Sequence, residues 1–588
     1  MRAVAGYSMR ALAFAWSAIL LAASADADWP EAHEREIAHY EPGTPVLAAD
    51  RYNPVPGFRG RVARLEQINS RNAAGDESKK VWRAVAWRNE RVHGQFVVWT
   101  GEPLAQIRCE LKPFADAAGR AWPSTNAETR FVRYVRGGLL TWRREMREPP
   151  AFVGDCLDTI ERIDLPVNGF RPIWLTVRPP KDVPAGLYRS TLTVRAEGGR
   201  KLEFPLELAV LDRTLPDPQD WRIFVDLMQH PWAIARYHGV VPFSPEHYRL
   251  MRPYCEALAE VHARTITCTI VDLPWNHQSY DPYRSMVRHV KNPDGTWTRD
   301  YSALDGYVDF ALSCGIGPYI HCFSMVPWGN VVAYEDATSG DIKRVTLSAG
   351  TPEYAAFWGP FLADFERHMK EKDWAKNTFI ALDERSPDEL RATVGLVRRH
   401  APSFRIQMGI NRMPEEFDGI ELESCCQAVT RITDEFLASA ARRRTEGKIT
   451  TYYACCSPDR PNTFLTSPMF EGRWFGLFAA RGLDGFCRWA VWNWMKDPFD
   501  DVSFGGDDGN WMPGDPYLLY PGPRSSTRWE MLRDGFENFE KIRLLRENGE
   551  VSAALEKALD GIDYFTVRGL GDEATERAIG VVESELNR

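Results

Sequence analysis

The stretch "NTFIALDERSPDELRATVGLVRRH", residues 377–400, contains one complete strand, loop and helix. An apolar run over residues 377–382 ends in two adjoining acids, Asp383 and Glu384. Ser386 and Pro387 then suit the N-cap and the first position of a helix. A buried strand followed by a short loop and a capped helix is the unit from which parallel α/β folds are built.

The same unit recurs along the chain after residue 217. Helical patterns such as residues 244–263 lie between apolar runs that have strand character. We expect strands at residues 221–227, 264–270, 316–322, 377–382, 405–410, 418–423, 449–455 and 484–490. One helix is missing from the pattern between the fifth and sixth strands. Eight strands alternating with helices predict a TIM-like (β/α)8 barrel, an α/β barrel, over residues 217–525, with a doubly wound sheet as the second choice.

The regions on either side of the barrel have different patterns. Residues 28–216 show short apolar alternations broken by turn residues, which predicts an all-β sandwich. The segment "RTLPDPQD", residues 213–220, has the composition of a linker between domains. Residues 526–588 contain amphipathic helical patterns, so we expect a helix that closes the barrel and a small C-terminal helical cap.

The first 27 residues have the pattern of a signal peptide. Arg2 and Arg10 precede a mostly apolar run over residues 11–25, which ends in small residues suited to cleavage. This run is too short to cross a bilayer comfortably, and no later segment has the pattern of a membrane span. We therefore expect a protein that is exported to the periplasm or secreted.

Composition and charge narrow the classes of partner. A formal net charge of -9 and the lack of a dense basic stripe disfavour nucleic acid. The 21 Trp and 20 Tyr suit a carbohydrate, because the apolar C–H face of a pyranose packs on an aromatic ring. The 12 His show no metal-ligand spacing and no Gly-rich phosphate loop occurs, so we predict neither a metal nor another cofactor. The oligomeric state stays open.

Chemistry in a barrel of this kind takes place at the carboxyl ends of the strands, so the residues just after each strand are the candidates. The acid pair, Asp383 and Glu384, is the candidate for catalysis. The candidates for substrate binding are Trp328, Tyr453, Trp489, Asn493, Trp494 and Asp515. Packing in the core is the alternative role for the Trp side chains, and capping of a turn is the alternative role for Asp515.

Two consecutive acids can face one site only where the strand pleat breaks down, at the tip of the strand. At about 6 Å apart and an effective dielectric constant of about 20, the two carboxylates would repel by roughly 2.8 kcal/mol, which raises one pKa by about two. One carboxyl group could then donate a proton while the other stays ionised. A solvated strand end before a capped helix is the alternative explanation.

Adjacent acids cannot easily flank a glycosidic bond from opposite sides, at the separation of about 5 to 9 Å that standard glycosidases use. A 2-acetamido sugar removes this difficulty, because its acetamido oxygen can attack the anomeric carbon. The enzyme then needs one acid/base and a second carboxylate that orients the amide N–H. Such an intramolecular attack can lower the barrier by about 7 to 11 kcal/mol.

Several stretches of the chain resemble glycoside hydrolase family 123 and related proteins that share its catalytic domain. These stretches are "LMQHPWAIARYHGV", "ALDE", "YYACCSP", "LDGFCRWAVWNWMKDPF" and "GDPYLLYPGPRSSTRWEMLRDGFENFEKI". With the sandwich, the resemblance spans most of residues 50–545. It implies an exo-acting β-N-acetylgalactosaminidase with substrate-assisted catalysis. It also implies that Asp383 orients the acetamido group, that Glu384 is the acid/base, and that Tyr453, Trp489 and Trp494 line the sugar subsite.

The sequence departs from the family pattern in two places. The family usually has proline directly after its acid pair, whereas Arg385 and Ser386 precede Pro387 here, which changes the entry to the helix. The family motif after the eighth strand tends to place Asn two positions before its last Trp. Trp492 occupies that position here and Asn493 follows it, which bears on a hydroxyl contact and on sugar specificity.

Two other functions fit the same residues. The first is a non-catalytic glycan-binding protein that keeps the aromatic site without turnover. The second is a retaining glycosidase for sugars that lack the acetamido group, with Asp272 or Asp515 as its nucleophile. The sequence also leaves N-acetylgalactosamine and N-acetylglucosamine unseparated, since the two sugars differ at one hydroxyl.

Overall fold

The computed structural model describes residues 58–63, 81–140, 146–167, 169–412, 414–417, 420–454, 468–499, 514–564 and 572–588. The predicted signal peptide lies outside these ranges. No helix within them is both long and apolar enough to cross a membrane.

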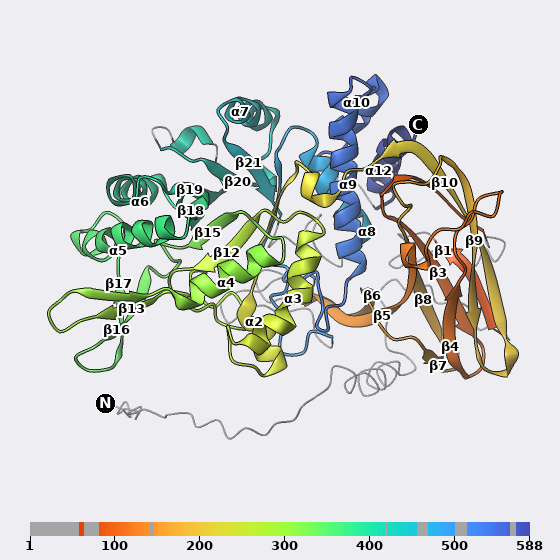
Figure 1. Ribbon diagram of the computed structural model, residues 1–588, viewed down its shortest axis with the longest axis horizontal. Coiled ribbons are helices and arrows are strands. Elements are labelled where there is room, and N and C mark those ends of the chain that lie inside the picture. Colours follow the sequence, from red (N-terminus) through yellow and green to blue (C-terminus); the bar gives the residue numbers. More distant parts are fainter. Residues whose placement is uncertain are drawn as a thin grey trace. The chain divides into compact units, whose positions relative to one another are not determined.

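The N-terminal strands form two five-stranded sheets, in the orders β1-β3-β8-β5-β6 and β2-β10-β9-β4-β7 (Figure 1). Phe96 and Ile173 from one sheet and Leu206 from the other are fully buried in a common core. The alternation seen in the sequence thus puts one face of each sheet against the other. The strands are β1 (Phe58–Ala63), β2 (Trp82–Arg88), β3 (Val92–Thr100), β4 (Leu104–Leu111), β5 (Ala127–Leu140), β6 (Met146–Leu157), β7 (Ile163–Leu165), β8 (Phe170–Val177), β9 (Gly186–Arg195) and β10 (Lys201–Thr214).

The next region is an eight-stranded parallel sheet that curls into a nearly closed barrel, as predicted. Its strand order is β11-β22-β21-β20-β19-β18-β15-β12. The two end strands meet at a parallel bridge between Val225 and Ala263. The strands are β11 (Phe224–Leu227), β12 (Thr265–Thr269), β15 (Tyr319–Phe323), β18 (Thr378–Asp383), β19 (Arg405–Ile410), β20 (Ser424–Ala428), β21 (Ile449–Tyr453) and β22 (Gly485–Arg488).

The sixth barrel strand does not lie where the sequence pattern placed it. The apolar alternation at residues 418–423 predicted a strand there, but β20 begins at Ser424. Glu423 instead binds the N-terminal end of the neighbouring strand, since its carboxylate accepts the Ile406 N–H at 2.8 Å. Cys425 and Cys426 then lie inside β20 and are buried. Pairing with β19 and β21, which the local pattern cannot reveal, therefore decides the position of this strand.

Helices cover the barrel between most strands. Ser386 caps α6 as predicted, with a reciprocal bond from its backbone N–H to Glu389. The described residues between β19 and β20 form only the short 3-10 helix η6 (Pro414–Phe417). The α-helices are α2 (Pro231–His238), α3 (Pro245–Ala259), α4 (Ser302–Ser313), α5 (Pro352–Glu371), α6 (Pro387–His400), α7 (Asp434–Thr445), α8 (Pro468–Ala479), α9 (Thr527–Glu547), α10 (Ala553–Asp560) and α12 (Asp572–Leu586).

A small second sheet is built from the loops that follow β12 and β15. Its strand order is β14-β13-β16-β17. The strands are β13 (Arg288–Lys291), β14 (Trp297–Asp300), β16 (Val331–Asp336) and β17 (Ile342–Thr346). Pairing of β13 with β16 joins the two loops. These loops contain Trp275 and Trp328, near the carboxyl end of the barrel.

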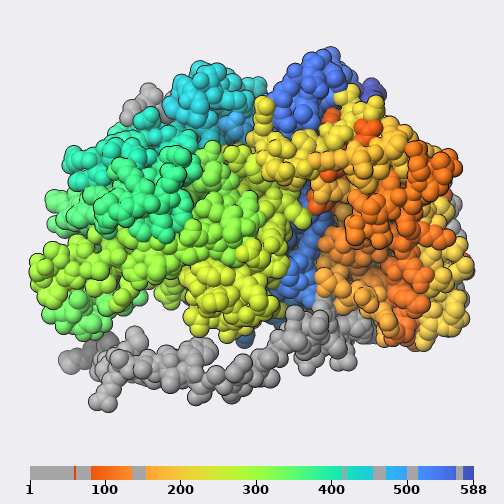
Figure 2. Space-filling model, viewed as in Figure 1, coloured from red at the N-terminus to blue at the C-terminus, as the bar shows by residue number. Residues whose placement is uncertain are grey.

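Helix α9 lies between the barrel and the sandwich and contacts both. Gly476 of α8 and Gly535 of α9 let the two helices touch, because a Cβ on Gly476 would lie 1.8 Å from the Gly535 carbonyl oxygen. In the space-filling view, blue C-terminal residues form a lobe at the top and a narrow strip that continues between the orange sandwich and the yellow-green side of the barrel (Figure 2). Most residues of α9 are buried, charged residues included.

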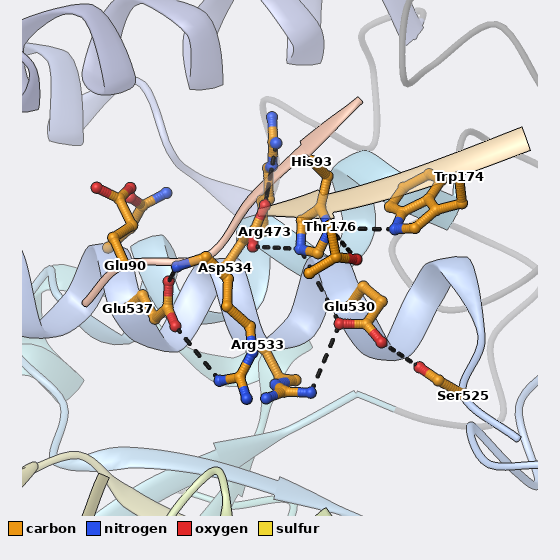
Figure 3. A network of polar contacts seen from close by, with 12 residues as sticks. Glu90, His93, Trp174, Thr176, Arg473, Ser525, Glu530, Arg533, Asp534 and Glu537 are labelled. Atoms are coloured by element: carbon orange, nitrogen blue, oxygen red, sulfur yellow. Dashed lines mark hydrogen bonds and ion pairs between the residues drawn. The ribbon is translucent and has the colours of Figure 1, made fainter. Parts of the chain in front are cut away.

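Ion pairs join α9 to the sandwich strands (Figure 3). Asp534 lies 3.1 Å from Nε2 of His93, and Glu530 lies 3.1 Å from a guanidinium nitrogen of Arg130. We call Glu530, Asp534 and Glu537 the α9 acid cluster. Their side chains are at most 8% exposed, so each needs a buried partner.

Candidate active site

Asp383 is the last residue of β18, and its side chain faces the interior of the barrel. Asp226 of β11 and His321 of β15 approach to 3.4 Å across the intervening strand β12, so both point inward. His321 is in register with Phe379, which places Phe379 and, at two-residue intervals, Asp383 on the same inward face. The first acid therefore points inward at the carboxyl end of the barrel.

Glu384 would point outward if the strand continued, but its backbone turns. Its φ angle of 45° is in the left-handed region, which is unusual for a residue with a side chain. Its N–H still bonds the Gly409 carbonyl oxygen at 2.9 Å. This local break in the pleat lets both members of the acid pair serve one site, and left-handed residues of this kind gather at functional sites.

Two neutral donors hold the Glu384 carboxylate. The hydroxyl of Tyr453, at the end of β21, donates to Oε1. The side-chain amide of Asn411, just after β19, donates to Oε2 at 3.2 Å. These bonds stabilise the ionised form of Glu384 that would remain after it gives up a proton.

Two indoles hold Asp383. Trp328 Nε1 donates to Oδ2 at 2.7 Å, and Trp275 provides a second hydrogen bond. Burial raises the pKa of Asp383 to about 6, with repulsion from Glu384 as the second cause and the two indoles acting against the rise. The sequence predicted a raised pKa from repulsion alone, whereas loss of hydration is the larger cause here.

Gly409 allows Asp383 to occupy this position. It is paired with Asp383 across β18 and β19. A Cβ at Gly409 would lie 3.2 Å from Oδ1 of Asp383, closer than ordinary packing allows. A side chain at this position would therefore require the carboxylate to shift by a few tenths of an ångström.

Aromatic side chains form a wall beside Asp383. Trp275 packs against Phe323 at 4.8 Å between ring centroids and against Trp489 at 6.3 Å. Trp328 is 38% exposed, which leaves part of its ring open to a ligand. The arrangement offers two carboxylates, neutral donors and apolar ring surface, which is what acid–base chemistry on a sugar needs.

Comparison with known families decides the assignment. Residues 228–545 match the model of the glycoside hydrolase 123 catalytic domain, which is more than half of the chain. Residues 67–196 match the glycoside hydrolase 123 N-terminal domain. The chain belongs to glycoside hydrolase family 123. It is therefore a glycosidase that acts on a carbohydrate, and the resemblance noted in the sequence is confirmed.

One solved structure agrees with the family 123 fold over nearly its whole length. A family 123 glycoside hydrolase from Clostridium perfringens, studied for glycolipid glycan hydrolysis, matches with a TM-score of 0.82 at 22% identity, covering 90% of this chain and 97% of that one. A family 5 xyloglucanase from Bacteroides ovatus matches with a TM-score of only 0.30 at 9% identity, covering 81% of this chain and 99% of that one. No curated protein sequence matches the chain.

The structure brings some predicted site residues of this family 123 protein together and separates others. Tyr453 and Trp328 bond directly to the acid pair, and Trp489 reaches it through Trp275. Trp494 does not fit the predicted sugar subsite, because it is fully buried and its indole donates to the Leu519 carbonyl oxygen at 2.7 Å. The rings of Tyr237 and Tyr254 cover it at 5.4 Å, so Trp494 is a core residue.

Asp515 and Asn493 are also fully buried. Asp515 lies 3.3 Å from a guanidinium nitrogen of Arg488, so it is a paired structural acid and does not fit a substrate contact or a nucleophile. Neither side-chain amide atom of Asn493 has a hydrogen-bond partner among the described residues. Asp272, the other proposed nucleophile, accepts the Ser285 N–H at 2.9 Å, which ties it to its own loop.

Three residues beside the acid pair were missed in the sequence as functional residues. They are Trp275, Arg385 and Asn411. Asn411 directly follows the fifth strand, so the rule that barrel chemistry uses strand ends could have identified it. The same rule covers Arg385, which follows the fourth strand, and Trp275, in the loop after the second. Their contacts with Trp328 and Asp383, however, depend on the tertiary structure. No group of three or more metal-ligating side chains occurs within the described ranges.

Proposed function

We propose that this family 123 glycosidase removes terminal β-linked N-acetylgalactosamine by substrate-assisted, retaining hydrolysis. The convergence of adjacent acids on one site carries the proposal. The backbone turn at Glu384 directs its side chain to the same site as Asp383. Two neighbouring residues cannot hold a glycosidic bond between their carboxylates, as standard glycosidases do. A sugar that brings its own nucleophile fits such a site.

In the first step, the acetamido oxygen attacks the anomeric carbon while Glu384 gives its proton to the departing glycosidic oxygen. Positive charge then develops on the acetamido nitrogen, and the ionised Asp383 accepts its N–H and stabilises the charge. Trp275 and Trp328 hold this carboxylate in place from two different loops. The apolar rings also offer a surface for the acetamido methyl group.

In the second step, the ionised Glu384 takes a proton from water, and the oxygen of that water attacks the anomeric carbon from the face that the leaving group left. The bond between the anomeric carbon and the acetamido oxygen breaks, which restores the acetamido group. The product sugar keeps its β configuration. Tyr453 and Asn411 stabilise Glu384 in the ionised form between the two steps.

Two finer parts of the proposal concern location and natural substrate. The pattern of residues 1–27 supports export, so we propose a periplasmic or secreted enzyme. The similar Clostridium perfringens enzyme was studied for glycolipid glycan hydrolysis, which supports glycolipid glycans as a substrate class here.

A panel of aryl β-glycosides tests the proposal. We expect release from the 2-acetamido galactoside, with weaker or no release from the 2-acetamido glucoside and from plain β-galactosides. We also expect a thiazoline analogue of the cyclised sugar to inhibit. Release from plain β-galactosides without any from 2-acetamido sugars would overturn the proposal in favour of an enzyme-borne nucleophile.

A further inference from the structure

Arg385 is a buried cation that has no direct ion pair with any residue that the structure describes. Arg385 directly follows the acid pair in the sequence and is only 9% exposed. Its Nε and Nη2 atoms are buried and lack hydrogen-bond partners among the described residues. Burial lowers the pKa of Arg385, and Asp383, Glu389 and Glu384 act against this fall through space. A buried guanidinium with two unbonded nitrogens is costly, so its position calls for a role.

The guanidinium packs on an aromatic ring. Its carbon lies 4.6 Å from the centroid of the Trp328 ring. The same indole donates its N–H to Asp383 at 2.7 Å. Arg385, Trp328 and Asp383 thus form a chain of contacts that ends on the carboxylate.

We propose that Arg385 is a positioning residue for Asp383, acting through the Trp328 indole. The proposal rests on the function proposed above, in which Asp383 must meet the acetamido N–H in one orientation. Stacking by a flat, delocalised cation restricts the rotation of the ring and thereby directs its N–H at Asp383.

Trp328 needs such support because of where it lies. It is in the loop after β15, and 38% of its surface is exposed. Its backbone is tied at one point, where its N–H bonds the Pro274 carbonyl oxygen at 3.0 Å. Arg385 covers the ring without a bond to it, which leaves the indole N–H for Asp383.

Arg385 also acts on Asp383 through its charge, and this second effect can be separated from the first. The charged groups that act on Asp383 are Glu384, which raises its pKa, and Arg385, which lowers it. The other elements packed around it contribute the uncharged indoles of Trp275 and Trp328 and, on β19, Gly409. Lysine at position 385 would keep the charge and lose the planar stack, whereas methionine would lose both.

A double-mutant cycle tests the proposal. Arg385→Met should lower kcat on the aryl 2-acetamido galactoside by about tenfold, since a small misplacement of a catalytic group has effects of this size. In a Trp328→Phe background, Arg385→Met should cause no further loss, because the ring N–H on which it acts is already absent. Arg385→Lys should have a kcat as low as that of Arg385→Met. The midpoint of its acid limb in the pH profile of kcat/KM should stay near that of the wild type. Arg385→Met should move that limb to higher pH.

Arg405→Met is the matched control. Arg405 also stacks on a ring, at 4.4 Å from the Phe379 centroid, but at the start of its strand and away from the acid pair. The Trp328 indole N–H resonance, assigned with Trp328→Phe, should shift in Arg385→Met and not in Arg405→Met. The proposal is overturned if Arg385→Met lowers kcat equally with Trp328 and with Phe at position 328. It is also overturned if Arg385→Lys has the wild-type kcat, or if the indole resonance does not move in Arg385→Met.

The indole resonance is measured without turnover, so it tests the role of Arg385 independently of the proposed function. If the wild-type protein cleaves no 2-acetamido glycoside, the proposed function fails. The pH titration of the Trp328 indole in wild type, Arg385→Met and Arg405→Met would still show whether Arg385 holds the indole on Asp383.

Discussion

Two groups of acids in this protein differ in the kind of partner that holds them. At the carboxyl end of the barrel, Trp328 and Tyr453 donate to the acid pair, and both donors are neutral. In the α9 acid cluster, Glu530 and Asp534 lie against guanidinium and imidazole groups (Figure 3). Carboxylates occur in both places, more exposed in the acid pair than in the α9 acid cluster, and the charge of the partner differs.

The partner decides whether a buried acid can exchange protons near neutral pH. Burial raises the pKa of Asp383 to about 6, since no contacting cation offsets the loss of hydration. Arg533, Arg130 and His93 hold the pKa of Glu530 far below its ordinary value in spite of complete burial. A buried acid with neutral donors is therefore a candidate for catalysis, and a buried acid with cations is a candidate for structure.

Glu384→Gln should have the largest effect. Glutamine keeps the shape and can still accept the bond from Tyr453, although its NH2 group cannot accept the bond from Asn411. It cannot give or take a proton, so kcat/KM should fall by about 10³-fold. Steady-state hydrolysis of the aryl 2-acetamido galactoside measures this. The melting temperature should stay close to that of the wild type. Near wild-type turnover in this variant would show that Glu384 is not the acid/base.

Glu530→Gln should have the largest effect on stability. It removes one of the carboxylates that neutralise Arg533 and Arg130, which keep Glu260 and Glu128. The free energy of unfolding should therefore fall by about 2 kcal/mol. Urea unfolding monitored by fluorescence measures the change. The fraction that stays folded should hydrolyse substrate at the wild-type kcat. A large loss of kcat in folded protein would mean that the α9 acid cluster serves the reaction.

Asp383→Asn should change activity and stability in opposite directions. The amide can still accept the indole N–H but cannot stabilise a positive charge, so kcat should fall by about 10²-fold. The folded-state pKa of Asp383 is raised, so its stabilising contribution is complete below about pH 4 and is lost as the pH rises through about 6. At pH 7 the variant should therefore melt at a higher temperature than the wild type. A lower melting temperature would show that Asp383 is a structural acid.

Activity itself should depend on the ionised form of Asp383. The acid limb of kcat/KM in the wild type should have its midpoint at about pH 6, because the protonated carboxyl cannot accept the acetamido N–H. Asp383→Asn should lose this limb. A limb at the ordinary pKa of aspartate would mean that the carboxyl is well hydrated in the free enzyme.

Glu537→Gln should have the smallest effect and sharpens the comparison within α9. Burial raises the pKa of Glu537 to about 8, so it is largely protonated at neutral pH in spite of a nearby Arg91. Glutamine should therefore change stability by less than about 1 kcal/mol at pH 5. Between pH 5 and 8 the wild type should lose stability relative to the variant, because a raised folded-state pKa costs stability as the pH rises through it. Thermal melts across this range measure the difference.

The barrel could be predicted from the sequence because each strand and helix carries its own pattern. Residues 377–400 contain the apolar strand, the helix cap and the acid pair within one short stretch, and all three were found there. The sixth strand was misplaced because residues 418–423 imitate a strand while Ser424–Ala428 pairs with the neighbouring strands. The acid pair could be identified because two acids at a strand tip are unusual in themselves.

The partners of the acid pair were decided only by the tertiary structure. Trp489 and Trp494 are five positions apart and look alike in the sequence, yet Trp489 packs on Trp275 beside Asp383 and Trp494 is enclosed by tyrosines. Trp328 reaches Asp383 from 55 positions away. Local periodicity reports which residues prefer a strand or a helix, but hydration and hydrogen bonding depend on side chains from distant segments. Only folding around the barrel brings those side chains together and shows which aromatic residues lie beside the acid pair.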